Sequence, residues 1–209
     1  MQKTILIILV IIVTPYFVKG QDFYAGAKGG LVLSQIDGDN FGGYHKFAGL
    51  GGVYVRNNMG ETWGYRMEMY YIQKGSHRFD PIPYYKAKLN YIEIPFLFTY
   101  KMERLKIPPS IDWFFDRKLH LHAGISLGYL FKATEDNGYG PNEATFAFRR
   151  IEIAGQAGLN YYFSPHWAID FRMSYTMLPI RGMPTVSDIY YWWRFQCNRV
   201  LSFGLVYEL

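Results

Sequence analysis

Cysteine is nearly absent from this chain of 209 residues, which contains Cys197 and no other. A single thiol cannot form an internal disulfide, so the fold must be stabilised in another way. We interpret Cys197 as a small side chain near the end of a strand. An intermolecular bridge through its sulfur is the alternative interpretation.

Long hydrophobic runs are also absent. The run from Ile5 to Val13 is too short to cross a membrane as a helix. It follows a short positive start that includes Lys3, and the small residue Gly20 comes after it. This order is typical of a secretory signal peptide. We therefore expect residues 1–20 to be a signal peptide and residues 21–209 to be the exported domain.

Runs of basic residues and catalytic signatures are missing as well. The formal net charge is +5, but no Lys/Arg run or basic helix concentrates it, which argues against a nucleic-acid partner. No Gly-x-Ser-x-Gly elbow, phosphate-binding loop or paired-carboxylate motif is evident. The sequence therefore predicts no catalytic, cofactor-binding or metal-binding residues, and no cofactor.

Aromatic residues and glycine are, by contrast, abundant. Aromatics make up 19% of the chain, and there are 21 glycines. Tyr and Phe favour strands, and together with glycine they suit strands that curve around a barrel and carry rings at a membrane interface. From residue 21 onward no long helical period appears, whereas a period of two residues recurs. Composition and period together predict an all-β domain.

Eight segments carry this alternation and are predicted to be strands. In the clearest of them, Leu119–Lys132, apolar side chains fill one face. The other face is polar and includes His120, His122 and Lys132, with Leu130 as the exception. The eight predicted strands are about Phe23–Leu33, Phe47–Arg56, Tyr65–Tyr71, Tyr91–Lys101, Leu119–Lys132, Arg150–Phe163, Trp167–Met177 and Asn198–Leu209.

The predicted connections differ in length between the two ends of the strands. Four are long and rich in turn residues: Ser34–Lys46, Lys74–Lys88, Ala133–Arg149 and Leu178–Trp193. Connections two and six are tight, at Asn57–Glu61 and Ser164–His166, while the fourth, Met102–Arg117, is long and carries two prolines. Long loops at one end and short turns at the other are expected of an outer-membrane barrel.

A soluble eight-stranded barrel of the lipocalin type is the rival fold. Such a barrel needs charges along the outer face of each strand. Here the apolar faces are long, continuous and edged with Tyr, Phe and Trp, which suits contact with lipid, and barrel closure pairs every backbone group. We therefore predict an eight-stranded antiparallel up-and-down transmembrane β-barrel, located in the outer membrane.

The polar faces would then point into the lumen. Eight strands enclose an interior that side chains nearly fill, and buried charges must find partners. A mixture of acidic and basic groups therefore predicts a plugged, rigid interior, and a selective pore is the alternative. The residues predicted to face the lumen are Arg66, Glu68, Glu93, Arg150, Glu152, Asp170, Arg172 and Glu208.

Other polar residues were weighed as sites. His120 and His122 share one strand face, a spacing that can bind a metal, but no further ligands accompany them, so we interpret them as lumen residues. Asp37 and Asp39 lack the rest of a calcium-loop pattern and are interpreted as solvated turn residues. An enzyme site at the rim of the loops would draw on Ser34, His45, His77 and Asp188.

Three stretches resemble the PorT-like outer-membrane barrels of Bacteroidetes: a glycine-rich Ala25–Gly30, then Gln73–Ser76, then Tyr-x-Glu-x-Pro at Tyr91–Pro95. The resemblance covers essentially the whole mature chain, although the bulky fourth connection and the terminal Leu209 depart from the commoner pattern. It implies an outer-membrane location and, for some members, a place in the type 9 secretion and gliding machinery. In the Tyr91–Pro95 stretch, Pro95 is expected to interrupt a ladder hydrogen bond.

The favoured function is a non-enzymatic barrel that serves as a subunit or anchor of an envelope complex. Its partners would be outer-membrane lipid and other envelope proteins. The alternatives are an outer-membrane enzyme that acts on lipid or peptide at the loop rim, and a small-solute pore. Exposed loop aromatics are the candidate protein contacts: Trp113, Phe114, Phe115, Trp192 and Trp193.

Overall fold

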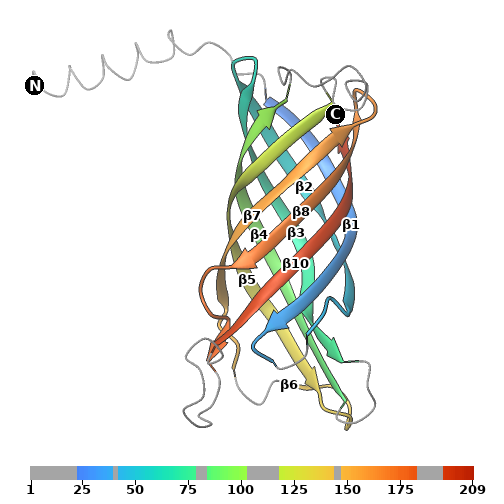
Figure 1. The fold of residues 1–209 in the computed structure, drawn as a ribbon, viewed down its shortest axis with the longest axis vertical. Helices are drawn as coiled ribbons and strands as arrows, with labels where there is room; N and C mark the ends of the chain where they lie inside the picture. The colour runs from blue at the N-terminus through green and yellow to red at the C-terminus, as the bar shows by residue number, and fades with distance from the viewer. Residues whose placement is uncertain (1–22, 40–41, 79–83, 103–117, 144–146, 183–194) are drawn as a thin grey trace, which may run out of the picture.

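The computed structural model of the chain describes residues 23–39, 42–78, 84–102, 118–143, 147–182 and 195–209 (Figure 1). The predicted signal peptide, residues 1–20, lies outside this part, as do Asp188 and the five loop aromatics predicted as protein contacts. The described residues contain no helix long and apolar enough to cross a membrane.

Eight long strands in the described part form a closed antiparallel barrel (Figure 1). Each pairs with the next along the chain, and β1 pairs with β10 from Gly26↔Glu208 to Asp37↔Cys197, which closes the ring. The two-residue strands β6 and β9 pair antiparallel with β5 and β10, respectively. The bounds are β1 Phe23–Asp37, β2 Lys46–Met59, β3 Trp63–Arg78, β4 Tyr85–Lys101, β5 Leu119–Asp136, β6 Asn142–Glu143, β7 Ile151–Tyr162, β8 Trp167–Thr176, β9 Arg181–Gly182 and β10 Phe195–Glu208.

The two ends of the barrel differ. The C-terminus, the start of β1 and the tight β2–β3 and β7–β8 turns lie together at the upper end in Figure 1, here called the termini end. The β1–β2, β3–β4, β5–β7 and β8–β10 connections lie at the opposite end, here called the loop end. The predicted asymmetry of the connections follows this division. Because no edge strand remains, the ladder satisfies the backbone groups of the wall.

Glycine permits close contact between neighbouring strands. A Cβ atom built at Gly30 on β1 would lie 2.2 Å from the carbonyl oxygen of Phe203 on β10. A Cβ atom at Gly52 on β2 would lie 2.2 Å from the carbonyl oxygen of Met69 on β3. Side chains at these positions would force the strands apart, so glycine lets β1 pack closely on β10 at the closing seam and β2 pack closely on β3.

The strands alternate between a polar interior and an apolar outer wall, as predicted. On β3, Arg66 and Glu68 are buried while Met67 and Met69 are exposed on the outside. Aromatic pairs border the wall at the termini end. The ring centroids of Trp63 and Tyr100 on β4 are 4.7 Å apart, and those of Trp167 and Tyr207 on β10 are 4.8 Å apart. Rings at the border of an apolar band are typical of membrane barrels.

Several strands are longer than predicted at the loop end. The predicted loops Ser34–Lys46 and Lys74–Lys88 were too long, because β1 continues to Asp37 and β3 to Arg78. Their inner side chains pack on a buried apolar cluster, which holds the ladder together beyond the alternating segments. Its members are Val32, Ile36, Leu50, Tyr70, Ile72, Ala87, Leu89, Tyr91, Leu130, Phe148, Ile180 and Val200.

A bulge in β5 explains the exception in its alternation. Asn90 pairs with Lys132 and Tyr91 with Leu130, so Phe131 is the extra residue on β5. Leu130 therefore faces the interior cluster, whereas both Phe131 and Lys132 are exposed. The prediction that Lys132 lies on the polar inner face was wrong, because the bulge reverses the faces beyond it.

Pro95 interrupts the β3–β4 ladder as expected, but it is not the bulge. The recorded pairs jump from Met67↔Phe96 to Tyr70↔Glu93 in unchanged register. Proline has no N–H to donate to the ladder. The irregularity on the other side of β4 falls at Asn90 and Tyr91 instead.

Candidate functional site

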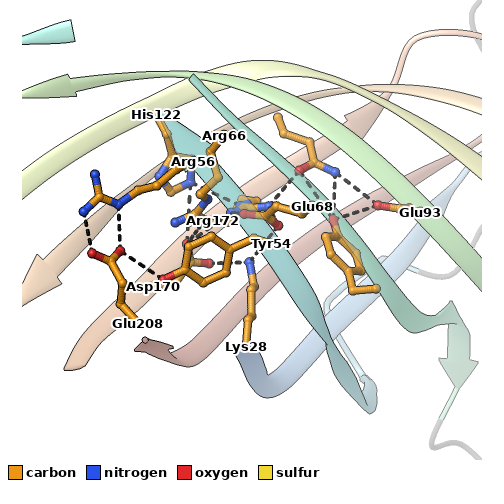
Figure 2. Close-up of polar contacts among 12 residues, drawn as sticks. Lys28, Tyr54, Arg56, Arg66, Glu68, Glu93, His122, Asp170, Arg172 and Glu208 are labelled. Carbon is orange, nitrogen blue, oxygen red and sulfur yellow. Dashed lines mark hydrogen bonds and ion pairs between the residues drawn. The ribbon is translucent and has the colours of Figure 1, made fainter. Parts of the chain in front are cut away.

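The barrel interior contains a central cluster of five buried charged side chains: Lys28, Arg66, Glu68, Asp170 and Arg172. Arg172 donates two hydrogen bonds of 2.8 Å to Glu68 and one of 3.1 Å to Asp170. Lys28 donates to the other oxygen of Asp170 at 2.8 Å, and Arg66 pairs with both carboxylates. These side chains come from β1, β3 and β8 and meet across the lumen (Figure 2). Bidentate charged bonds of this kind fix the side chains in place.

Neutral polar side chains surround this central cluster. Arg172 Nε donates to His122 Nε2 at 3.2 Å, which requires that nitrogen to be unprotonated. With its amide turned to suit its neighbours, Asn160 donates to Asp170 and accepts from Arg66, both at 2.6 Å. The central cluster has three cations for two carboxylates, so it carries an excess of positive charge.

A second cluster lies nearer the loop end and has the opposite excess. Lys74 pairs with Glu93 and, at 2.8 Å, with Glu152. Thr176 and Asn198 each donate to Glu152 at 2.8 Å. Here one cation faces two carboxylates, and the three charged side chains are almost completely buried.

Two side chains connect the clusters. Gln156 accepts from Arg172 at 3.1 Å and donates to Glu93 at 3.1 Å. Tyr70 donates to the same Glu93 oxygen at 2.8 Å. The positive excess of the central cluster is therefore linked by hydrogen bonds to the negative excess of the second.

A third group closes the interior at the termini end. Arg56 Nε donates to Glu208 at 2.6 Å, and Tyr54 donates to the same carboxylate at 3.2 Å (Figure 2). Together the three groups hold five cations and five carboxylates among the described residues. The interior charge thus balances within the barrel, which buried charges require.

The apolar cluster covers the charged network on the side of the loop end. Leu89, Tyr91 and Leu130 pack there with the nine other members of the apolar cluster defined above. Farther toward the loop end, Arg181 pairs with Glu135 at 2.8 Å, and its guanidinium lies 4.1 Å from the centroid of the Phe148 ring. The charged network and the apolar cluster next to it at the loop end match the predicted plugged interior.

The structure brings together seven of the eight residues predicted to face the lumen, and Arg150 is the correction. Arg150 is exposed and donates to Tyr129 on the outside at 3.2 Å. It precedes the first residue of β7, Ile151, so the alternation of that strand does not orient it. Lys74 and Arg56 were missed as lumen residues. Continuing the alternation of Arg66 and Glu68 by six residues would have found Lys74.

The remaining candidates do not form a site among the described residues. His120 and His122 share the inner face as predicted, but His120 packs on Tyr162, with ring centroids 4.6 Å apart. The described part of the chain contains no group of three potential metal ligands. Asp37 pairs with Arg199 at 2.7 Å.

Three of the four residues weighed for a rim enzyme lie in the described part of the chain: Ser34, His45 and His77. Ser34 was predicted in a loop, but it is buried on β1 and donates to the carbonyl of Gly75 at 3.0 Å. His45 precedes β2 and His77 lies near the end of β3, both at the loop end. Asp188 is outside the described residues, so the rim site stays a prediction.

Comparison with known proteins shows whether this barrel is soluble or lies in a membrane. The family model described as "Outer membrane protein beta-barrel domain" matches residues 19–180. The chain belongs to this family of outer-membrane β-barrels. Its apolar outer wall therefore contacts the lipid of the outer membrane, and the soluble alternative is excluded. In such barrels short turns face the periplasm and long loops face outward, so the loop end is the extracellular end.

Solved outer-membrane barrels share the fold. The attachment invasion locus protein Ail of Yersinia pestis, in complex with the heparin analogue sucrose octasulfate, is 14% identical with a TM-score of 0.51, over 90% of this chain and 99% of Ail. Neisserial surface protein A is 15% identical with a TM-score of 0.49, over 91% of this chain and 100% of that protein. A comparison with curated proteins gives no match. At these identities the likeness concerns the fold of the outer-membrane barrel alone.

Proposed function

We propose that this outer-membrane barrel is a non-enzymatic subunit or anchor of a cell-envelope complex, which acts through its loops and outer wall. The observation that carries this proposal is the filled interior. Three polar groups with balanced charge, two of them linked by hydrogen bonds, fill the interior between the termini end and the apolar cluster. A solute would have to displace both layers to cross the barrel.

The interior is better suited to holding the barrel rigid than to binding a ligand. Glu68 already accepts two hydrogen bonds from Arg172, and Glu152 already has three partners. Removing Lys74 would leave Glu93 and Glu152 without a paired cation, at a cost of about 3–5 kcal/mol. A rigid barrel offers partner proteins a fixed frame on which the outward loops are displayed.

Resemblance to the PorT-like barrels supports a narrower form of the proposal. The stretches Ala25–Gly30, Gln73–Ser76 and Tyr91–Pro95 carry that resemblance. It supports a role for the barrel in the type 9 secretion and gliding class of envelope machinery. In this form the partners contact the extracellular loops, the Met102–Arg117 connection or the lipid-facing wall. Tyr139, exposed in the β5–β7 connection, offers one described aromatic for such a contact.

Gentle detergent extraction of the tagged protein from its native outer membrane, followed by mass spectrometry, tests the proposal. We expect envelope proteins to co-purify in stoichiometric amounts, and Tyr139→Ser to reduce their recovery if they contact that loop. A second eight-stranded barrel with the same tag serves as the control. Recovery of the protein alone would contradict the subunit role and direct attention to enzyme assays at the loop rim.

A further inference from the structure

The outer wall of β4 and β5 changes from apolar to basic as it approaches the extracellular end. Along the outward face of β4, Ile94 and Ile92 are followed by Asn90, Lys88 and Lys86. On β5 the exposed ring of Phe131 is followed at once by Lys132, which the bulge also turns outward. We call Lys86, Lys88 and Lys132 the basic wall.

Aromatic and amide groups mark the border between the apolar wall and the basic wall. The rings of Tyr71 and Phe131 lie 6.1 Å apart on neighbouring parts of the outer surface. Tyr71 donates to Asn90 at 2.8 Å, and Gln73 donates to the same amide oxygen at 2.9 Å. Amphipathic rings of this kind lie at the level of the lipid headgroups. The lysines that follow therefore lie at or just above that level.

The spacing of the three lysines lets them act on one ligand. Lys88 on β4 is directly opposite Thr134 on β5, and Lys132 on β5 is directly opposite Asn90 on β4. Lys88 and Lys132 are therefore diagonal neighbours on adjacent strands. Diagonal neighbours are about 7–8 Å apart, and residues two apart on a strand about 6.6 Å. Flexible lysine side chains can cover these distances.

No ion pair to the basic wall is recorded within the described ranges of the chain. Lys86, Lys88 and Lys132 form none of the ion pairs recorded among the described residues. Asp136 is opposite Lys86, but one of its oxygens accepts the backbone N–H groups of Gly138 and Gly140 at 2.9 and 3.1 Å.

Other basic side chains near the loop end can be compared with the basic wall on β4 and β5. Nearby, Lys46 on β2 donates to Gln73 at 2.7 Å and to the carbonyl of Phe47 at 3.1 Å, so it adds positive charge beside the basic wall. At the β1–β10 seam, by contrast, the outward Arg199 is paired with Asp37. Positive charge without a recorded ion pair among the described residues therefore lies on the outer face of β4 and β5 but not at the β1–β10 seam.

We propose that the basic wall binds the phosphate groups of a phosphorylated glycolipid in the outer leaflet of the outer membrane. The lysines face sideways into the lipid, at headgroup level, directly beyond side chains that contact acyl chains. A lipid held there would place its phosphates on the ammonium groups and its chains along Ile92 and Phe131. This inference rests on the outer-membrane location and is independent of the proposed envelope complex.

Binding of diphosphorylated lipid A to the detergent-solubilised barrel, measured by native mass spectrometry, tests the proposal. Each basic residue near a charged lipid surface contributes about fivefold in affinity. We therefore expect Lys88→Gln to weaken binding about fivefold, and the triple Lys86→Gln/Lys88→Gln/Lys132→Gln variant to weaken it about 100-fold. Lys118→Gln, which removes an exposed charge at the termini end, is the matched control and should leave affinity within about twofold.

Lipid and competitor controls separate the sources of phosphate. Lipid A treated with phosphatase should bind the wild-type barrel as weakly as diphosphorylated lipid A binds the triple variant. Inorganic phosphate at millimolar concentration should not displace the lipid. The proposal is overturned if wild type does not bind, if the folded triple variant binds like wild type, if phosphatase treatment has no effect, or if inorganic phosphate competes. A heat-dependent shift in mobility on SDS gels, equal to that of the wild type, confirms that each variant is folded.

Discussion

Replacing one buried lysine by methionine should destabilise the barrel strongly at Lys74 and weakly at Lys28. Both side chains are buried, and both bond a carboxylate at 2.8 Å. Their surroundings differ, however. Among the described residues, Lys74 is the one cation paired with Glu93 and Glu152. Lys28 belongs to the cluster with excess cations, where Arg66 and Arg172 also hold Asp170.

The expected magnitudes follow from what each substitution leaves behind. Lys74→Met leaves two buried carboxylates with no cation, so the free energy of unfolding should fall by about 3–5 kcal/mol. Lys28→Met leaves two cations facing two carboxylates, and its loss should be about 1 kcal/mol, the net value of one hydrogen bond. Adding Glu152→Gln to Lys74→Met removes one of the stranded charges and should recover about 2 kcal/mol.

Equilibrium unfolding by urea in lipid vesicles provides the assay, with tryptophan fluorescence and gel mobility as two probes of folding. Equal losses for Lys28→Met and Lys74→Met would refute the reasoning from charge balance. So would a failure of Glu152→Gln to restore stability in the Lys74→Met background. Either result would mean that the two clusters do not act as separate groups with opposite excess charge.

Three further predictions concern the closing seam, the lipid-facing wall and export. Gly30→Ala should impair assembly, because the new Cβ would lie 2.2 Å from a carbonyl oxygen. Gly51→Ala should assemble normally, because the nearest atom to its Cβ is 3.9 Å away. The gel mobility of membrane fractions gives the amount of folded barrel for each variant. Met69→Arg on the outer wall should cost about 2–4 kcal/mol in vesicle unfolding if it lies near the bilayer midplane, and no loss would argue against lipid contact there. N-terminal sequencing of the protein from outer membranes should begin at Gln21, and an intact Met1 would contradict the predicted signal peptide.

The alternation of residues predicted the strands and most of the interior. Each strand needs only a two-residue period to separate its faces, which is why Glu68 and Arg172 could be placed from sequence. The alternation did not predict the ends of the strands where their inward-facing side chains are apolar. Ile72 on the inner face of β3 resembles a break in the alternation, so the strand appeared to end before Lys74.

The partners in the interior could not be predicted because they are distant in sequence. Lys28 and Asp170 are 142 positions apart, and Arg56 and Glu208 are 152 apart, so barrel closure alone brings them together. The β5 bulge was equally hidden, since one extra residue changes the face of Lys132 without changing the composition of the strand. Leu130 was its visible sign, an apolar side chain on the polar face.

Single-channel recording in planar bilayers tests the central claim of a sealed interior most directly. The wild-type barrel should insert without producing current steps above the baseline, because the charged network and the apolar cluster fill the lumen. A porin with an open channel, recorded under the same conditions, confirms that steps would be detected. Reproducible open states of the folded wild-type barrel would contradict the sealed interior and favour a small-solute pore.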